Sequence, residues 1–298
     1  MDARHLALLR ELADRGSVTA VAAATHRTGS AVSQQLRTAE RDLGVRLVEP
    51  VGRGLRLTDA GRLLAEAAVD VETALARVEA RLDEFRGRPT GTVRIAALTS
   101  AAEFLVPSVL VALAAQGIDI ELSDTDVSEE DYASLAADHD VVIGHSLLSA
   151  VPRGAEHLVH TVLAREPIDV ALPADHPLAA KEQVSPRDVV DEPWIGVPVG
   201  YPFATVLDGI ERATGRPVHV VQRVRDNHVV ESFVAAGVGL ALLPRFTTRA
   251  RDGVVLRPLR GVNARRWVVA LSRPDRAERA VVRRTVTALR DVGRLTAR

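Results

Sequence analysis

The sequence predicts two unlike parts: a small all-α module with a short hairpin and a long final helix, then an α/β domain. Three observations carry this. Two helix patterns only a few residues apart lie between Ser17 and Gly44. Residues 59–86 form one uninterrupted heptad pattern, and from Thr92 short apolar strands alternate with helices. A length of 298 residues fits two or three domains.

The composition is that of a globular protein, with 47% hydrophobic and 26% charged residues. No apolar run approaches the roughly twenty residues that span a bilayer, and the N-terminal MDARHLALLREL is typical of a helix rather than a signal peptide. The chain has no cysteine, which excludes disulfides and thiolate chemistry and leaves only histidines and carboxylates for a metal site. We therefore expect a cytoplasmic protein without a metal or cofactor.

The net charge of −1 hides an asymmetry along the chain. Residues 1–58 hold nine arginines and six acidic residues, a net charge of +3, which leaves −4 for the remainder. A weakly basic end on an acidic body fits a nucleic-acid-binding module attached to a regulatory domain. Because the excess is small, we expect dimerisation to be needed for firm binding.

The stretch from Ser17 to Gly44 has the pattern of a helix-turn-helix. Ser17 can cap a short helix over 18–25, and Thr28 can cap a second over 29–43 that Gly44 ends. Residues 3–15 form a preceding helix. One face of the second helix is apolar, and the other carries the residues that we expect at DNA base edges: Ser30, Ser33, Gln34 and Arg37. Thr28 is expected on a phosphate; two ordinary helices of a bundle are the alternative.

Residues 45–58 predict a hairpin with the tip Gly52-Arg53-Gly54, a wing whose Arg53 can enter a minor groove. The helix after it has a seam of apolar residues at alternating four- and three-residue spacings, typical of a helix that pairs with its twin. A helix packed on its own domain is the alternative. The seam comprises Leu64, Ala68, Val71, Leu75, Val78, Leu82 and Phe85, and a hinge follows at 87–91.

The α/β part is expected to have strands at 92–98, 118–124, 140–145, 160–173 (in two pieces), 195–198, 218–224, 239–244 and 265–272, and a closing helix over 278–292. Ligands of such sheets bind beyond the carboxyl ends of strands, near helix N-termini. Four loops there supply our ligand-binding candidates: Thr99, Ser100, Gly144, His145, Gly200, Tyr201, Phe203 and Asn227. For any one of them, helix capping is the alternative.

An acidic cluster follows the second of these strands, at Asp124, Asp126 and 129–131. It favours a cationic ligand only if it faces this ligand site, because Ser128 with Asp131 also resembles a capping box. Gly144-His145-Ser146 resembles a nucleophile elbow poorly, since Leu148 stands where glycine is needed. We therefore expect no enzyme; an α/β hydrolase remains the least favoured alternative.

In order, the motif S-A-V-S-Q-Q-L, the L-G helix end, the hairpin and L-T-D-A-G resemble the DNA-binding region of LysR-type transcriptional regulators over residues 3–64. Gly29 and Pro50 depart from the usual pattern, so the usual half-site preference is not assumed. The resemblance implies a winged helix-turn-helix at 1–58, a linker and dimerisation helix at 59–87, and an effector domain at 88–298. That domain would have two Rossmann-like subdomains, like periplasmic binding proteins of type 2: one at about 91–161 and 269–298, the other at about 162–268.

We thus expect a homodimeric or homotetrameric regulator that binds double-stranded promoter DNA and a small-molecule effector, and no membrane. A solute-binding or sensor protein whose N-terminal helices contact proteins instead of DNA is the alternative. The sequence does not identify the effector, the operator or the direction of regulation.

Overall fold

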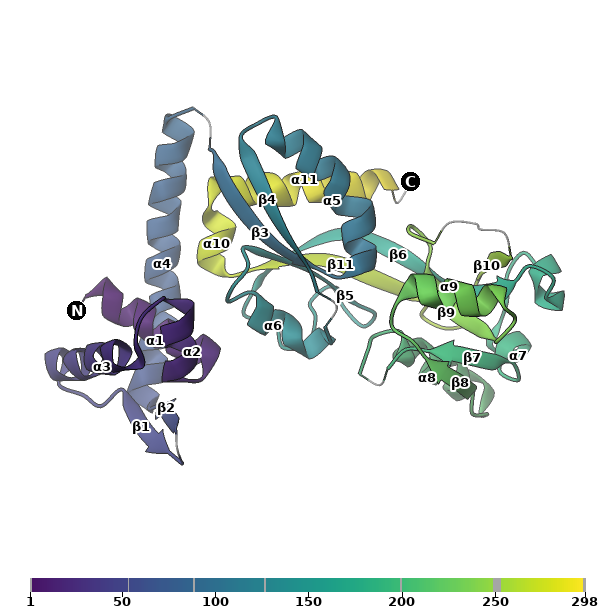
Figure 1. Ribbon diagram of the computed structural model, residues 1–298, viewed down its shortest axis with the longest axis horizontal. Helices are drawn as coiled ribbons and strands as arrows, with labels where there is room; N and C mark the ends of the chain where they lie inside the picture. Colours follow the sequence, from purple (N-terminus) through teal and green to yellow (C-terminus); the bar gives the residue numbers. More distant parts are fainter. Residues whose placement is uncertain are drawn as a thin grey trace.

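The computed structural model describes residues 2–52, 54–87, 89–125, 127–198, 200–248 and 253–296. These residues form an elongated molecule. The N-terminal helices lie at one end beside one long helix, and a two-lobed α/β region extends to the other end (Figure 1). The last helix lies in the lobe next to the long helix, so the chain leaves this first lobe, builds the second and returns.

The N-terminal unit consists of three helices and a hairpin: α1 (Ala3–Arg15), α2 (Val18–Ala24), α3 (Gly29–Leu43), β1 (Val48–Val51) and β2 (Gly54–Leu57). The predicted bounds of α3 are confirmed. Its cap Thr28 accepts a hydrogen bond from the Ala31 amide, and Gly44 ends it with a left-handed φ of 67°. The apolar faces of the helices and hairpin meet in one core around Leu9, Val21, Val32, Leu36 and Leu57.

The hairpin is held against α3 and α4 (Asp59–Phe85) by specific contacts. Glu40 of α3 accepts hydrogen bonds from the amides of Leu47 and Val48 through Oε1, at 2.9 and 3.3 Å. A Cβ added to Gly61 would lie 2.2 Å from the Leu47 carbonyl oxygen, so only glycine allows α4 to approach this closely. The wing therefore has a fixed position relative to α3.

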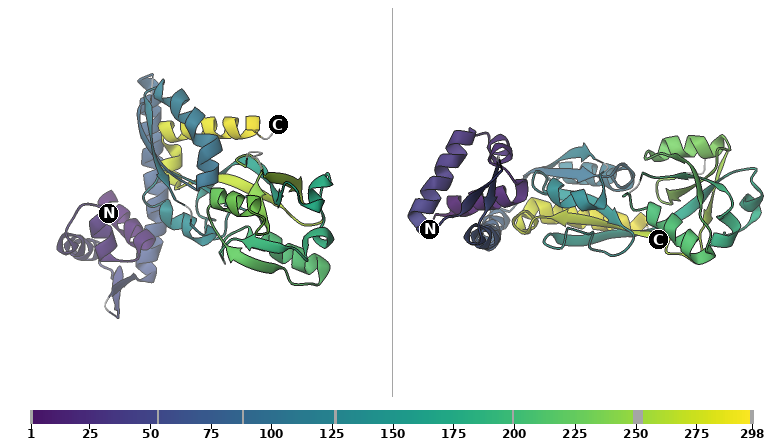
Figure 2. Two further views of the ribbon diagram at one scale, coloured as in Figure 1. Left: turned by 45° about the vertical axis from the view of Figure 1, so that its right-hand side comes forward. Right: turned by 90° about the horizontal axis from the view of Figure 1, so that it is seen from below.

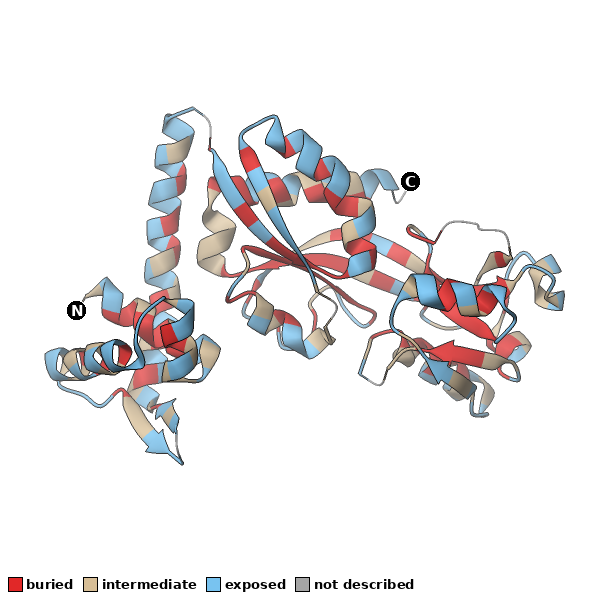
Figure 3. Ribbon diagram, viewed as in Figure 1, coloured by how far each residue is buried: buried red, intermediate tan, exposed pale blue. Residues whose placement is uncertain are grey.

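One face of α4 packs on its own chain, and another is exposed (Figure 3). Of the predicted seam, Val71, Leu75, Val78, Leu82 and Phe85 are exposed, Phe85 to 88%. The seam prediction is wrong at its N-terminal end. Leu64 packs against the core of the N-terminal unit, and Ala68 is fully buried. Both residues are therefore packed within one chain and are not available to a second copy. The large apolar residue that is exposed in this first part of α4 is Leu63.

The first lobe has three parallel strands, β4 (Ile118–Asp124), β3 (Gly91–Ala97) and β5 (Val141–Ser146), with β11 (Arg265–Ser272) antiparallel to β5. Two long helices, α5 (Thr99–Ala114) and α11 (Ala280–Thr296), pack on one face of this sheet. The other face is covered by α6 (Tyr132–Leu135) and the 3₁₀ turn Glu129–Asp131 before it.

The second lobe is built on β7, which is parallel to both β8 and β9, while β6 pairs antiparallel with β9 and β10. α7 and α8 lie in one apolar core and α9 in another, on the opposite face. The bounds of these elements are β6 (Val159–Pro173), the 3₁₀ turn Pro177–Ala180, α7 (Pro186–Val189), β7 (Pro193–Gly196), α8 (Ala204–Thr214), β8 (His219–Arg223), α9 (Asn227–Ala235), β9 (Leu240–Pro244) and β10 (Val254–Pro258).

Two strands, β6 and β11, connect the lobes. The prediction of β6 in two pieces is wrong, because one continuous strand pairs with β11 up to Pro167 and with β9 and β10 from Ile168. The change of partner thus falls later than the expected 161, and β11 is paired from Arg265, earlier than the expected 268. The closing helix, predicted over 278–292, is observed as α11 from Ala280 to Thr296, and a short helix that was not predicted, α10 (Pro274–Glu278), precedes it. The two are separated at Arg279, which has an extended conformation.

The N-terminal unit and α4 are docked on the first lobe through α10. Figure 2 shows from two further directions that the N-terminal unit lies beside this lobe and away from the second. At the contact, Arg10 of α1 and Arg273 before α10 are only 4% and 6% exposed. Both pair with Asp14, Glu72 and Asp275, and Arg273 also pairs with Glu11. We call these six residues the junction cluster.

Candidate functional site

The exposed face of α3 carries the predicted DNA-contacting residues. Thr28, Ser30, Gln34 and Arg37 are exposed, and Ser33 is half-buried. The Oε1 atom of Gln34 accepts hydrogen bonds from Nε and Nη2 of Arg37, at 3.2 and 2.8 Å. A fork of amide and guanidinium groups is therefore already aligned on the solvent side of the helix.

Thr28 has a structural task as well, because its hydroxyl caps α3 and lies 2.9 Å from the Ser30 hydroxyl. The predicted minor-groove residue, Arg53, lies outside the described residues.

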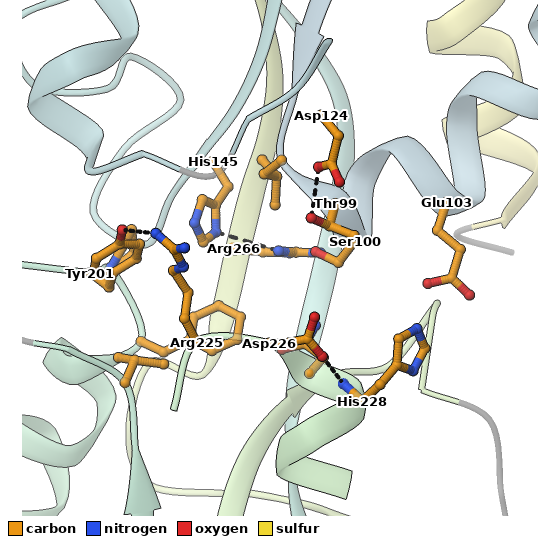
Figure 4. A pocket seen from close by; sticks show the side chains of 15 residues that line it. Thr99, Ser100, Glu103, Asp124, His145, Tyr201, Arg225, Asp226, His228 and Arg266 are labelled. Atoms are coloured by element: carbon orange, nitrogen blue, oxygen red, sulfur yellow. Dashed lines mark hydrogen bonds between the residues drawn. The ribbon is translucent and has the colours of Figure 1, made fainter. Parts of the chain in front are cut away.

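A cavity of about 310 Å³ lies between the two lobes, at the ends of the strands (Figure 4). Six of the predicted effector-binding residues line it: Thr99, Ser100, His145, Tyr201, Phe203 and Asn227. They come from four different loops, so the tertiary fold brings together side chains that are far apart in the sequence.

Two predicted residues do not line this cavity. Gly144 is buried beneath Tyr132, where an added Cβ would lie 2.7 Å from the tyrosine ring. Gly200 lines a second hollow of about 650 Å³ that shares Tyr201 and Pro202 with the first. Both glycines were predicted because they lie close to strand ends, but Gly144 packs against Tyr132 and Gly200 occupies a turn with a left-handed φ of 93°.

The floor of the cavity is formed by Arg266 of β11, which the sequence analysis missed. Arg266 is 1% exposed and pairs with Glu166 of β6, itself fully buried, at 2.6 Å between Nη2 and Oε2. Its Nη2 also donates to the Ser100 hydroxyl oxygen at 3.0 Å. Glu166 accepts a second hydrogen bond from the Phe246 amide, at 2.6 Å. A buried charge is therefore compensated on all sides.

His145 completes this floor. Its Nδ1 lies 3.5 Å from Nη1 of Arg266. Because an arginine N–H can only donate, Nδ1 is the acceptor and the ring proton belongs on Nε2, an assignment made from the hydrogen-bond partner. Burial, reinforced by the positive charge of Arg266, holds the pKa of His145 well below its usual 6.5, so the ring is neutral.

Phe203 connects the second lobe to this floor. Its ring packs edge-on against His145, with ring centroids 5.5 Å apart, and lies 5.7 Å from the Arg266 guanidinium. The cavity floor therefore contains groups from both lobes and from the strand that joins them.

The wall of the cavity carries charged groups that the sequence analysis assigned only in part. Asp124, the first residue of the predicted acidic cluster, lines the cavity and accepts a hydrogen bond from the Thr99 hydroxyl at 2.8 Å. Glu103 and Arg225 also line it and were missed. Arg225 donates to the Tyr201 hydroxyl at 3.1 Å.

The rest of the acidic cluster lies elsewhere. Glu129 and Glu130 line the second hollow, and the Ser128 hydroxyl bonds the Asp131 carboxylate. Asp126 lies outside the described residues.

The nucleophile-elbow interpretation of Ser146 meets a physical obstacle. The side chain is fully buried, and its hydroxyl oxygen accepts the Leu148 amide at 3.3 Å. Within the described ranges, no group of three or more histidines and carboxylates has the arrangement of a metal site. Over the same ranges, no helix is both long and apolar enough to cross a membrane.

Two family models match the chain. One, described as "Bacterial regulatory helix-turn-helix protein, lysR family", covers residues 3–62, and the other, "LysR substrate binding domain", covers residues 86–294. The chain belongs to the LysR family. It is accordingly a transcriptional regulator with a helix-turn-helix DNA-binding domain and an effector-binding domain, as its residues 3–64 predicted.

Relatives in the LysR family include the transcriptional dual regulator GltC of Bacillus subtilis, 29% identical over 251 residues, which are 83% of this chain and 82% of GltC. OxyR of Escherichia coli is 26% identical over 293 residues, 97% of this chain and 95% of OxyR.

Two solved structures share the fold. A full-length OxyR variant from Pseudomonas aeruginosa has a TM-score of 0.66 at 20% identity, with 99% of this chain and 95% of that one covered. Full-length BenM has a TM-score of 0.56 at 22% identity, with 99% and 97% covered.

Proposed function

We propose that this LysR-family regulator binds promoter DNA as a homodimer or homotetramer and that a small molecule in the 310 Å³ cavity modulates that binding. In this proposal residues 1–58 bind DNA, 59–87 dimerise and 88–298 sense the effector. The observation that carries it is the position of the cavity. It lies where both lobes meet the connecting strand β11, so a bound ligand contacts both lobes and the strand that joins them.

The surface of α3 supports DNA contact through two kinds of residue. Gln34 and Arg37 present donors and an acceptor suited to base edges, while the helix N-terminus with Thr28 suits a phosphate. Ser30 and Ser33 complete the base-facing set, and we keep Arg53 for the minor groove.

The exposed residues of α4 support self-association. Val71, Leu75, Val78, Leu82 and Phe85 form an apolar stripe on a helix whose other face is already packed. Each Å² of apolar surface that is removed from water contributes about 25 cal/mol of stabilising free energy, so pairing of two such stripes stabilises a dimer. Two DNA-binding modules, each weakly charged, would then act together.

We propose that the chain is not an enzyme and acts in the cytoplasm, where its DNA partner is. Several relatives are named hydrogen peroxide-inducible genes activators. The present 298 residues contain no cysteine, so a peroxide response through thiol oxidation is not available to them. The effector is therefore sought among molecules that bind without reacting.

DNA recognition is tested with Gln34→Ala and a fragment from upstream of the protein's own gene. We expect a loss of about 1–3 kcal/mol in binding free energy on that fragment and little change on random DNA, measured by fluorescence anisotropy. Gln116→Ala, the same change in the exposed turn after α5, is the matched control. Equal losses on both DNAs would show that Gln34 does not contact bases, and no binding by the unmodified chain would contradict the DNA-binding proposal.

A further inference from the structure

The floor of the cavity offers hydrogen-bond donors. Because Arg266 donates to the Ser100 oxygen, the hydroxyl proton of Ser100 remains for a ligand. Because Nδ1 of His145 faces Arg266, the Nε2 proton is also available, and the structure shows no partner for it among the described residues. His145 is 5% exposed and points into the cavity (Figure 4). A ligand group that meets this floor has to accept hydrogen bonds.

The N-terminus of α5 adds to this set of donors. The sixteen-residue helix begins at Thr99 and has no side-chain cap. The Ala101 amide already donates to the Leu98 carbonyl at 3.0 Å, so the amides of Thr99 and Ser100, which have no acceptor among the described residues, and the helix dipole remain for a ligand. The charge of Arg266 is compensated by Glu166, so the floor itself is close to neutral. Several N–H and O–H donors converging without an excess of charge suit one carboxylate.

The wall beside the floor has the opposite character. Glu103, Asp124 and Asp226 line the cavity with carboxylates, of which Asp226 also caps α9, and Arg225 is the lining arginine that is not paired with Glu166. The lining therefore has a negative balance, which opposes a ligand that carries only negative charge. A ligand that satisfies both surfaces needs an acceptor group for the floor and a cationic group for the wall.

The two surfaces adjoin each other. Asp124 accepts the hydroxyl hydrogen bond of Thr99 at 2.8 Å, and Thr99 directly precedes Ser100 of the floor. Glu103 lies one helical turn further along α5. Because the hydrogen-bond donors of the floor lie next to the carboxylates of the wall, the negative and positive groups of the ligand also have to lie close together.

We propose that the effector is a zwitterion of the α-amino acid type. Its carboxylate binds the first turn of α5, the Ser100 hydroxyl and Nε2 of His145. Its ammonium group binds Asp124 and Glu103. A volume of about 310 Å³ suits a molecule of this size. This inference rests on the proposed function, because it names the class of molecule for the same cavity.

The test uses the full chain and the twenty proteinogenic L-amino acids at about 10 mM in a thermal-shift assay, followed by calorimetry of each that binds. Each binding amino acid is compared with the carboxylic acid that lacks its ammonium group and the amine that lacks its carboxylate. We expect at least one amino acid to raise Tm and both of its analogues to bind at least roughly tenfold more weakly. No binding by any of the twenty, or equal binding by either analogue, would overturn the proposal.

Asp124→Asn sharpens the test, with Asp119→Asn on the exposed part of the same strand as the matched control. Asp124→Asn should weaken amino acid binding about tenfold or more and leave binding of the deaminated acid unchanged or stronger, while Asp119→Asn changes neither. Glu103→Gln should act in the same direction. If Asp124→Asn and Asp119→Asn behave alike, the assignment of the ammonium site is wrong.

Anisotropy with upstream DNA on the same preparations, without amino acid, separates the two proposals. Retained DNA binding together with no amino acid binding removes only the inference about the effector. Absence of DNA binding removes the proposed function.

Discussion

The molecule buries arginines in two regions, and the two are built differently. In the cavity floor, Arg266 has one carboxylate partner, Glu166, and both are almost fully buried. In the junction cluster, Arg10 and Arg273 contact four carboxylates from α1, α4 and α10, three of which they share. The floor contains one arginine and one carboxylate on neighbouring strands. The junction cluster contains two arginines and four carboxylates, which come from three helices.

The cavity floor therefore has a fixed geometry, whereas the geometry of the junction cluster depends on how the N-terminal unit is docked. The floor pair joins neighbouring strands β6 and β11, so its geometry is set by the sheet register. The junction exists only while the N-terminal unit is docked on the first lobe. Burial by itself would lower the pKa of Arg273, but Asp275, Asp14 and Glu11 more than offset this, and the pKa lies above its ordinary value.

One strand connects the two regions. β11 contains Arg266, and Arg273 follows its last residue directly. At about 3.3 Å per residue, the two arginines are roughly 23 Å apart along the chain. A change at the cavity floor and a change in domain docking therefore act on opposite ends of the same strand.

The largest expected effect comes from Arg266→Met, which leaves Glu166 buried without its partner. Breaking one side of a buried ion pair costs about 3–5 kcal/mol of unfolding free energy. Urea unfolding followed by the fluorescence of Trp194 and Trp267 measures it, because both tryptophans lie in the two-lobed region. The double variant with Glu166→Gln should recover most of the loss. A loss below about 1 kcal/mol, or no recovery in the double variant, would contradict the description of the floor as a balanced pair.

A smaller effect is expected for Arg273→Gln, about 1–3 kcal/mol, because Arg10 still contacts Glu72 and Asp275. The loss should appear as faster hydrogen exchange in α1 and the middle of α4, with the lobe cores unchanged. Arg284→Gln, on the exposed side of α11, is the matched control. Exchange in α1 equal to that of the control would show that the junction cluster does not hold the N-terminal unit.

The two regions should also lose stability in different pH ranges. Burial and the charge of Arg266 depress the pKa of His145 in the folded state. The contribution of His145 to the free energy of unfolding is therefore fully present above pH 6.5, the pKa in the unfolded chain, and is lost as the pH falls towards the pKa in the folded state. Beside the junction cluster, Arg15 of α1 pairs with Asp138 of the first lobe at 2.7 Å. This hydrogen bond lowers the pKa of Asp138 from 3.8, so this docking contact is fully present above pH 3.8 and weakens as the pH falls below it.

Urea midpoints of the lobes and hydrogen exchange of α1, both followed against pH, measure the two ranges separately. His145→Gln should remove the part of the lobe pH dependence that lies just below 6.5. An unchanged profile in this variant would show that His145 is not the group that titrates.

The smallest effect is expected for Arg283→Gln, which removes an ion pair with Glu84 on the exposed side of the same interface. Solvent-exposed pairs contribute less than about 1 kcal/mol, so unfolding should shift little. A loss as large as that of Arg273→Gln would mean that burial does not distinguish the two arginines.

The sequence predicted elements with local signals well. α3 is bounded by a capping threonine and a left-handed glycine, and both signals lie within its own residues. Six of eight effector candidates line the cavity because strand ends and helix starts can be identified from pattern. The exposed seam from Val71 to Phe85 was visible for the same reason.

Features that depend on tertiary contacts were missed. Arg266 and Glu166 lie inside apolar strands, and only the register of β6 with β11 makes them a pair. Pro167 suggested an interruption of β6, but it lies where the strand changes partners. Leu64 has the spacing of the heptad, but it packs against the core of the N-terminal unit, a contact that the spacing does not reveal.

The protonation of His145 tests the account of the cavity floor most directly. Nitrogen-15 NMR of histidine-labelled protein, with His145→Gln to assign the signal, distinguishes the two neutral tautomers and the imidazolium. We expect a neutral ring with its proton on Nε2 throughout the range of about pH 6 to 8. A protonated ring at neutral pH, or a proton on Nδ1, would contradict the donor floor and the carboxylate site built on it.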